Sequence, residues 1–167
     1  MSSESLRSSI LAAREYRQFI LEQHLQAGYP ATLLFSLNIP GKDKNPPGAA
    51  ALFQQTLAEL RTRFPVAAIL AKESDLLGPW ALMGLDMEAG VVKLGCIELE
   101  EAQPSARLID LDVYDRHGGQ IDRKSLSLGP RPCLVCDQPA VDCIRLGRHT
   151  FEELTGKTDE LLAHFRD

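Results

Sequence analysis

Four stretches of the chain have the apolar spacing or the capping residues that are typical of helices. In the first stretch apolar residues recur every three to four positions until Gly28, a residue type that favours helix ends. Asn45, which is followed by two prolines, is suited to cap the second. The predicted helices cover residues 5–26, 46–63, 88–102 and 151–165.

Short apolar runs between these helices predict strands. Thr32–Ile39, Val66–Leu70 and Pro79–Leu85 are mostly apolar and are typical of buried strands. Leu108–Tyr114 alternates strictly, and His117–Gln120 is a tight turn. The expected order is α-β-α-β-β-α-β-β-α, which indicates an α/β (α+β) fold with a mixed β-sheet flanked by helices.

Length and composition favour one domain over residues 1–167 in the cytoplasm. Residues 1–9 are polar and no signal-peptide core follows them, and no apolar run approaches the roughly 20 residues that cross a membrane. In a reducing cytosol the four cysteines are expected to be thiols or metal ligands. The net charge of −5 argues against nucleic-acid binding.

Positive charge is concentrated in the segment from residue 116 to residue 149. Six Lys or Arg residues stand there against three acids. Such a basic face on an acidic protein suits a phosphorylated small molecule or an acidic partner, and the alternative is a solvated surface. Arg131, Arg145 and Arg148 are candidates to bind phosphate because the guanidinium fork matches phosphate oxygens, although pairing with Asp137 or Asp142 is a competing explanation.

Asp110 and Asp112 are the candidate catalytic residues. Residues two apart on a strand point to the same face, so both carboxylates are expected to aim together. Two convergent carboxylates suit Mg²⁺, which prefers oxygen ligands and leaves room for substrate phosphates. An edge strand with a wet face gives the same alternation. Residues 98–101 are expected to form a solvated helix face, one acid of which could join the metal site.

Three cysteines and a histidine form a candidate zinc site. Cys133, Cys136, Cys143 and His149 are separated by two, six and five residues. The Cys-x-x-Cys pair is typical of a zinc knuckle, and Cys₃His is one of the closed sets that structural zinc uses. Three reduced thiols in a turn-rich segment are the alternative. Cys96 lies on a predicted helix and is expected to be a core residue.

The loop after the first strand is a candidate phosphate site. Asn38 and Gly41 stand at the end of the strand, where backbone amides and either Lys42 or Lys44 could meet a phosphate. A structural turn capped by Asn38 is the alternative. The sequence does not decide which lysine is used.

Several of these segments, in the same order, resemble one family. Cys-Leu-Val-Cys with Ala140, Cys143, Arg145 and Arg148-His149 resembles the C-terminal signature of apo-citrate lyase phosphoribosyl-dephospho-CoA transferases. Residues 107–113 resemble the family motif Arg-Leu-x-Asp-Leu-Asp-Val, and residues 37–41 its Leu-Asn-Ile-Pro-Gly segment. Together with Leu-Ala-Ala-Arg-Glu at residues 11–15, the resemblance spans nearly the whole chain. The Asp-x-Asp pattern is also similar to that of the wider nucleotidyltransferase superfamily, but no clear Gly-Ser turn precedes it.

The resemblance implies an enzyme that modifies citrate lyase. It would transfer the phosphoribosyl-dephospho-CoA group from 2'-(5''-triphosphoribosyl)-3'-dephospho-CoA to a serine of the acyl carrier protein (gamma) subunit, releasing pyrophosphate. Arg107, as part of the motif, is then expected to bind substrate, and Mg²⁺ to sit at the two aspartates. A related transferase for another carrier, such as that of malonate decarboxylase, is one alternative. A non-catalytic, zinc-stabilised adaptor that only binds the carrier is another.

Overall fold

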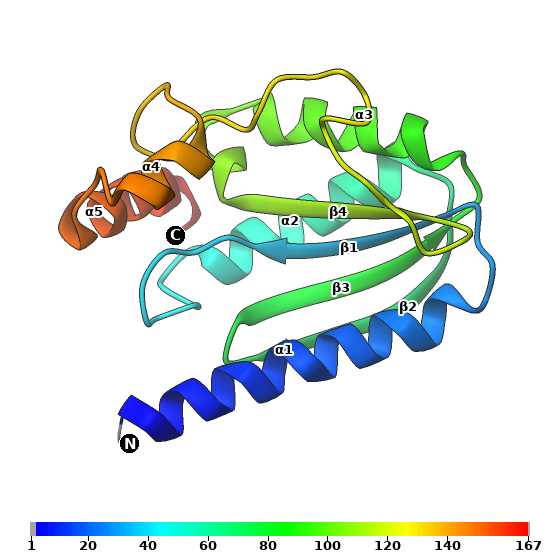
Figure 1. Ribbon diagram of the computed structural model, residues 1–167, viewed down its shortest axis with the longest axis horizontal. Coiled ribbons are helices and arrows are strands. Elements are labelled where there is room, and N and C mark those ends of the chain that lie inside the picture. The colour runs from blue at the N-terminus through cyan, green and yellow to red at the C-terminus, as the bar shows by residue number, and fades with distance from the viewer. Residues whose placement is uncertain (1–2, 167) are drawn as a thin grey trace.

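The computed structural model describes residues 3–166, except for the side chains of residues 3 and 6. Five strands form one sheet in the order β2-β3-β1-β4-β5, with the helices arranged around it (Figure 1). The longer helices and the strands are α1 (Ser3–Leu25), β1 (Ala31–Leu37), α2 (Ala49–Arg63), β2 (Val66–Asp75), β3 (Gly78–Leu85), α3 (Ala89–Glu101), β4 (Ile109–Asp115), β5 (Gln120–Ile121) and α5 (Phe151–Leu162). Three shorter helices are η1 (Pro104–Leu108), α4 (Ala140–Leu146) and η2 (Ala163–Phe165).

Helices flank a sheet as expected, but the sheet is not mixed. Every neighbouring pair of strands is antiparallel. The reason lies in the connections, because β2 and β3 form a hairpin, β4 and β5 form another, and β1 runs between them. The fold class is confirmed, and the sheet is corrected to an antiparallel one.

The two faces of the sheet are covered unequally. One face packs against α2, α3 and α5 and forms the main core, with Phe35 and Phe53 stacked 4.5 Å apart between ring centroids. On the other face α1 covers β2 and β3, where Leu21 packs on Trp80 and Leu82 (Figure 1). Arg17 fixes this helix through two hydrogen bonds to Asp75, of 2.8 and 2.6 Å. On β1 and β4, Leu34 and Tyr114 pack against this cluster, and Ser36 and Asp110 on the same face are only partly buried.

Several predicted boundaries are wrong, and packing explains most of them. Leu108, which was expected beside the aspartates, ends η1 and is buried in the main core. The second strand continues to Asp75 because it pairs with the whole of β3 through two bulges. The unpredicted helix α4 is seven residues long, too short for a periodic pattern. The last helix is not interrupted at Gly156, and it passes into η2 after Leu162.

The second helix does not begin at Asn45. Its N-cap is Gly48, with a φ of 94°, while the N–H of Asn45 donates to the carboxylate of Asp43. A Cβ at Gly48 would lie 2.8 Å from the carbonyl oxygen of Leu162, where α5 ends. Close approach of the last helix therefore selects glycine here, which the local sequence does not reveal.

Gly48→Ala is expected to lower the free energy of unfolding by at least about 2 kcal/mol, because it combines a left-handed backbone with a steric clash. Gly156→Ala is the matched control, since a Cβ there meets nothing within 4 Å and the position is inside α5. That control should gain up to about 1 kcal/mol. Urea unfolding of both variants measures the difference, and equal stabilities would contradict the close approach of α5.

Candidate active site and metal centre

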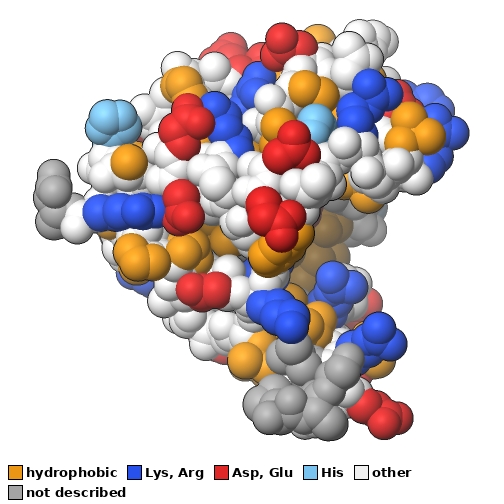
Figure 2. All heavy atoms as spheres, turned by 90° about the vertical axis from the view of Figure 1, so that its left-hand side faces the viewer, with side chains coloured by type: hydrophobic (Ala, Val, Ile, Leu, Met, Phe, Trp, Pro, Cys, Tyr) orange, Lys and Arg blue, Asp and Glu red, His pale blue; other side chains and the backbone are white. Residues whose placement is uncertain are grey.

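The two predicted catalytic aspartates lie on the face of the sheet that α1 packs against. Along β4, Ile109, Leu111 and Val113 are buried in the core, so Asp110 and Asp112 project from the opposite face. On the neighbouring strand they stand opposite Ser36 and Leu34. The predicted common orientation is confirmed. Figure 2 shows a hollow on the right of the molecule, with basic side chains above and below it.

The charge of this pair is only partly compensated. Arg131 Nη1 lies 3.3 Å from Asp110 Oδ1, and the Gln120 amide donates to Asp112 Oδ1 at 2.8 Å. Burial, and then the charge of Asp110, raise the pKa of Asp112. A half-buried carboxylate whose pKa is raised by a neighbouring carboxylate forms, together with that neighbour, a site that a hard cation would stabilise.

Arg131 links the aspartates to a cavity of about 240 Å³. Its guanidinium also donates to the backbone carbonyl oxygens of Arg107 and Ile109, which fixes it at the start of β4. The cavity is lined by Arg131 together with Asn38, Lys44 and Arg107. The fold thus brings together four predicted substrate residues from three separate segments, and an apolar wall that includes Leu134 and Ile144 completes the cavity.

Of the two lysines in the loop, Lys44 faces this cavity. Its ammonium donates to the carbonyl oxygen of Ile39, and burial, followed by the charge of Arg14, lowers its pKa. Lys42 is exposed, and with Gly41 it lines a neighbouring cavity of about 440 Å³. At Gly41 a Cβ would lie 3.0 Å from the ring of Phe151, so this glycine lets α5 approach the loop.

Two predicted phosphate-binding arginines are not at the cavity. Arg145 and Arg148 are both exposed, and the first forms an ion pair with Asp142 at 3.1 Å. This is the pairing that competed with a phosphate role. Of the three arginines near the cysteines, only Arg131 lines the cavity.

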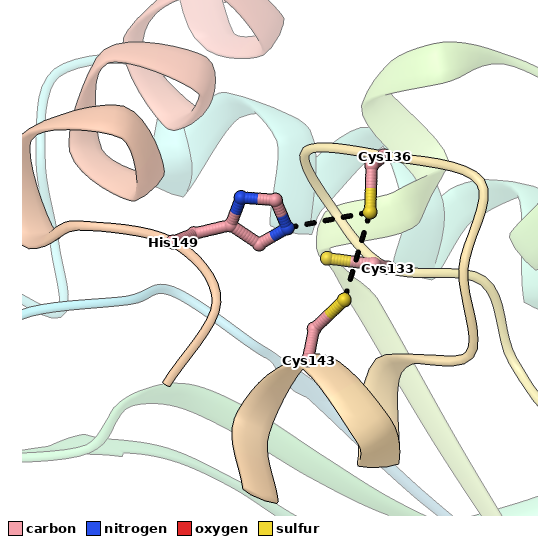
Figure 3. A group of neighbouring side chains, drawn as sticks. All are labelled: Cys133, Cys136, Cys143 and His149. Carbon is pink, nitrogen blue, oxygen red and sulfur yellow. Dashed lines mark hydrogen bonds between the residues drawn. The ribbon is translucent and has the colours of Figure 1, made fainter. Parts of the chain in front are cut away.

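The three cysteines and the histidine converge, as Figure 3 shows. The ligand atoms of Cys133, Cys136, Cys143 and His149 all lie within 4.8 Å of one another. Cys136 Sγ is 3.6 Å from Cys143 Sγ and 3.3 Å from His149 Nε2. Ligands at a Zn–S distance of about 2.3 Å would stand roughly 3.8 Å apart in a tetrahedron. The cluster could therefore hold a metal such as zinc.

The surroundings of this cluster suit a cation. Burial opposes ionisation of Cys133, but hydrogen bonds from the backbone N–H groups of Cys136 and Val135 and from the thiols of Cys143 and Cys136 together lower its pKa. For Cys143, burial and then the hydrogen bond with Cys136 raise the pKa to about 11. His149 Nδ1 is 4.0 Å from the Glu153 carboxylate, which is too long for a hydrogen bond.

The cluster is connected to the cavity through its backbone. Arg107 Nη1 donates to the carbonyl oxygen of Cys133 at 3.1 Å, and Ala140 N donates to that of Arg131 at 2.9 Å. Pro132 and Pro139 form a short antiparallel bridge that closes the loop. The position of Arg131 thus depends on the shape of the Cys/His segment.

The sequence model of the family described as apo-citrate lyase phosphoribosyl-dephospho-CoA transferase matches residues 6–165. The chain belongs to this family. Its match includes the aspartate pair, the cavity residues and the whole Cys/His cluster, so the features described above lie within the family's sequence.

Relatives of the family differ in length. Protein CitXG of Haemophilus influenzae is 35% identical over 158 residues, which cover 92% of this chain and 34% of that protein. Protein CitXG of Leuconostoc mesenteroides is 31% identical over 162 residues, covering 93% and 34%. The apo-citrate lyase phosphoribosyl-dephospho-CoA transferase of Escherichia coli O139:H28 is 31% identical over 159 residues, covering 92% and 86%. The chain spans about a third of the two CitXG proteins.

The sequence analysis missed Lys93 and placed Glu100 among the acids of a solvated helix face, one of which could join the metal site. Lys93 and Glu100 of α3 are only 7% and 5% exposed, although residues 98–101 were predicted to be a solvated helix face. That prediction is right for Glu98 and Glu101 and wrong for Glu100. A signal was present, because Lys93 and Glu100 stand three and four residues from Cys96, on the buried stripe of the helix. Cys96 itself is a core residue, as predicted.

The part of the chain that the structure describes contains no helix long and apolar enough to span a membrane.

Proposed function

We propose that this protein transfers the phosphoribosyl-dephospho-CoA group from 2'-(5''-triphosphoribosyl)-3'-dephospho-CoA to a serine of the acyl carrier protein (gamma) subunit of citrate lyase. The observation that carries the proposal is the aspartate pair joined by Arg131 to a cavity lined with Lys44 and Arg107, in a chain of this family. The family name supplies the chemistry, and the arrangement of acids and bases is suited to it.

The proposed reaction is a substitution at phosphorus. The serine oxygen of the carrier bonds to the phosphorus next to the ribose, and the bond from that phosphorus to the pyrophosphate oxygen breaks. The serine proton passes to a carboxylate at the aspartate pair, and pyrophosphate leaves with the bonding electrons. The nucleophile belongs to the carrier, so the proposal needs no covalent bond to this enzyme.

We assign Mg²⁺ to Asp110 and Asp112. The fit rests on two adjacent carboxylates, one of which has a pKa raised by burial and by the other. Bound there, Mg²⁺ supplies charge neutralisation at the attacked phosphorus and at the departing pyrophosphate. Lys44, Arg107 and Arg131 then bind the donor phosphates and orient the donor for attack.

We assign a structural Zn²⁺ to the Cys₃His cluster. Four protein ligands leave no open position, which is typical of structural rather than catalytic zinc. In this proposal the ion holds the segment from residue 131 to residue 149 in one shape, and so keeps Arg131 between the cavity and Asp110.

The proposal is tested by intact-mass spectrometry of the carrier subunit after incubation with this protein, the triphosphate donor and Mg²⁺. We expect a mass gain equal to the phosphoribosyl-dephospho-CoA group, located on one serine, with one pyrophosphate released per carrier. The malonate decarboxylase carrier serves as a competitor that identifies the preferred acceptor. A carrier that binds this protein without gaining mass would contradict the transferase and favour the adaptor.

A further inference from the structure

Strand β4 has an incomplete partner on its outer edge. One edge pairs with β1 along the whole strand, but β5 pairs only with Val113 and Tyr114. The backbone of Leu111, which lies between the two aspartates, therefore meets no strand on that side. An edge left open next to two half-buried carboxylates would allow this segment to shift.

Two buried side chains of α3 occupy this gap. Lys93 Nζ donates to the carbonyl oxygen of Leu111 at 2.6 Å, and the Leu111 N–H donates to Glu100 Oε1 at 3.2 Å. Both polar groups of one residue are thus held by one helix, in place of the missing strand. Arg123 in turn donates to Glu100 Oε2 at 3.2 Å and lies on the far side of the carboxylate.

Apolar packing alone does not account for these two residues. Burying an ammonium and a carboxylate carries a desolvation cost, and apolar side chains at the same positions of the stripe would complete the core. The two charged side chains achieve something that apolar side chains cannot, because they hydrogen-bond to the buried N–H and carbonyl groups of Leu111 and so fix the peptide on each side of it. The residues fixed in this way are the two aspartates.

We propose that Lys93 and Glu100 are positioning residues, which hold the Leu111 backbone so that Asp110 and Asp112 bind one divalent cation together. The inference rests on the proposed assignment of Mg²⁺ to the aspartates, and it adds two residues that do not touch substrate. A role through hydrogen bonds and a role through charge predict opposite changes in cation affinity when Lys93 is replaced, which allows a direct test.

The test measures Mn²⁺ binding by electron paramagnetic resonance, with no donor or carrier present, and then the rate of transfer with Mg²⁺. Lys93→Met is the decisive variant. Loss of a nearby positive charge would by itself tighten Mn²⁺ binding, whereas loss of the hydrogen bond to Leu111 should weaken it. We expect weaker binding, by roughly tenfold, and a kcat lower by about 10–100-fold with an unchanged KM for the carrier.

Variants of Glu100 also separate the effect of the charge from the effect of the hydrogen bond to Leu111. Glu100→Gln removes the charge but keeps an oxygen that can accept from the Leu111 N–H, so it should retain most of the Mn²⁺ affinity, while Glu100→Met should lose it. Glu98→Met is the matched control, an exposed acid of the same helix, and should behave like the native protein. Thermal unfolding and Leu111 amide exchange show whether each variant is folded and whether the edge has opened.

The outcomes distinguish the two proposals. Mn²⁺ binding at the aspartates is recognised by its loss in Asp112→Asn. If the native protein binds Mn²⁺ there but transfers nothing to the carrier, the proposed reaction is contradicted. The positioning role is then judged by the Mn²⁺ affinities of the variants alone. Folded Lys93→Met that binds Mn²⁺ as tightly as the native protein, or more tightly, would overturn the positioning role, as would equal affinities of Glu100→Gln and Glu100→Met. Native protein that binds no Mn²⁺ at the aspartates would overturn it too.

Discussion

Asp112→Asn is expected to slow transfer to the carrier by at least about 10²–10³-fold, because it removes one of two anionic ligands from the proposed Mg²⁺ site at the attacked phosphorus. The loss should appear in kcat, since the donor phosphates keep their contacts with Lys44, Arg107 and Arg131. Transfer is measured from the mass of the carrier, at Mg²⁺ concentrations up to saturation. Near-native turnover at saturating Mg²⁺ would contradict the assignment.

The fold of Asp112→Asn should be preserved, so a loss of transfer in this variant cannot be explained by unfolding. Asparagine keeps the oxygen that accepts from Gln120. Burial and Asp110 raise the pKa of Asp112, so its ionised form is disfavoured in the folded state, and its contribution to stability is lost as the pH rises through that pKa. At pH 7 the neutral side chain should therefore unfold at the same or a higher temperature. Asp86→Asn, at an exposed position, is the control for the loss of a carboxylate, and its transfer rate should not change.

The parts of the site that the sequence predicts are those that depend on local geometry. Strand alternation places the two aspartates on one face whatever surrounds them, and the structure agrees. The Cys-x-x-Cys turn likewise determines the approach of Cys133 and Cys136, and the spacing to Cys143 and His149 is short enough to close the cluster.

The parts that the sequence does not predict depend on which elements become neighbours. Lys44 rather than Lys42 lines the cavity, and the cavity forms only where the loop after β1 meets the Cys/His segment. The different positions of Arg131 and Arg145 also depend on the fold, because Arg131 reaches β4 whereas Arg145 pairs with Asp142 in its own helix. Glu100 was predicted to be solvated because its partner, the unpaired edge of β4, exists only once the sheet has formed and cannot be read from the helix sequence.

Removal of the proposed zinc should weaken donor binding at the cavity, although the metal itself does not line it. Cys136→Ser replaces the ligand that contacts both Cys143 and His149, and it should abolish the one zinc per chain that we expect in the native protein. Stability should fall by about 4 kcal/mol where free zinc is roughly 1,000-fold above its Kd. Zinc content, thermal unfolding and hydrogen exchange of residues 131–149 measure these effects.

The consequence for transfer distinguishes a metal that supports the site from one that supports only its own loop. Arg107 and Arg131 are tied to the backbone of this segment, so its disorder should raise the KM for the triphosphate donor by roughly tenfold or more. Cys96→Ala is the matched control, because it removes a buried cysteine of α3 outside the cluster and should leave both zinc content and KM unchanged. Zinc-free Cys136→Ser protein with a native KM would show that the cavity keeps its shape without the metal. A raised KM with an unchanged Mn²⁺ affinity would instead place the effect of zinc on the arginines and not on the aspartates, which are held from the other side by α3.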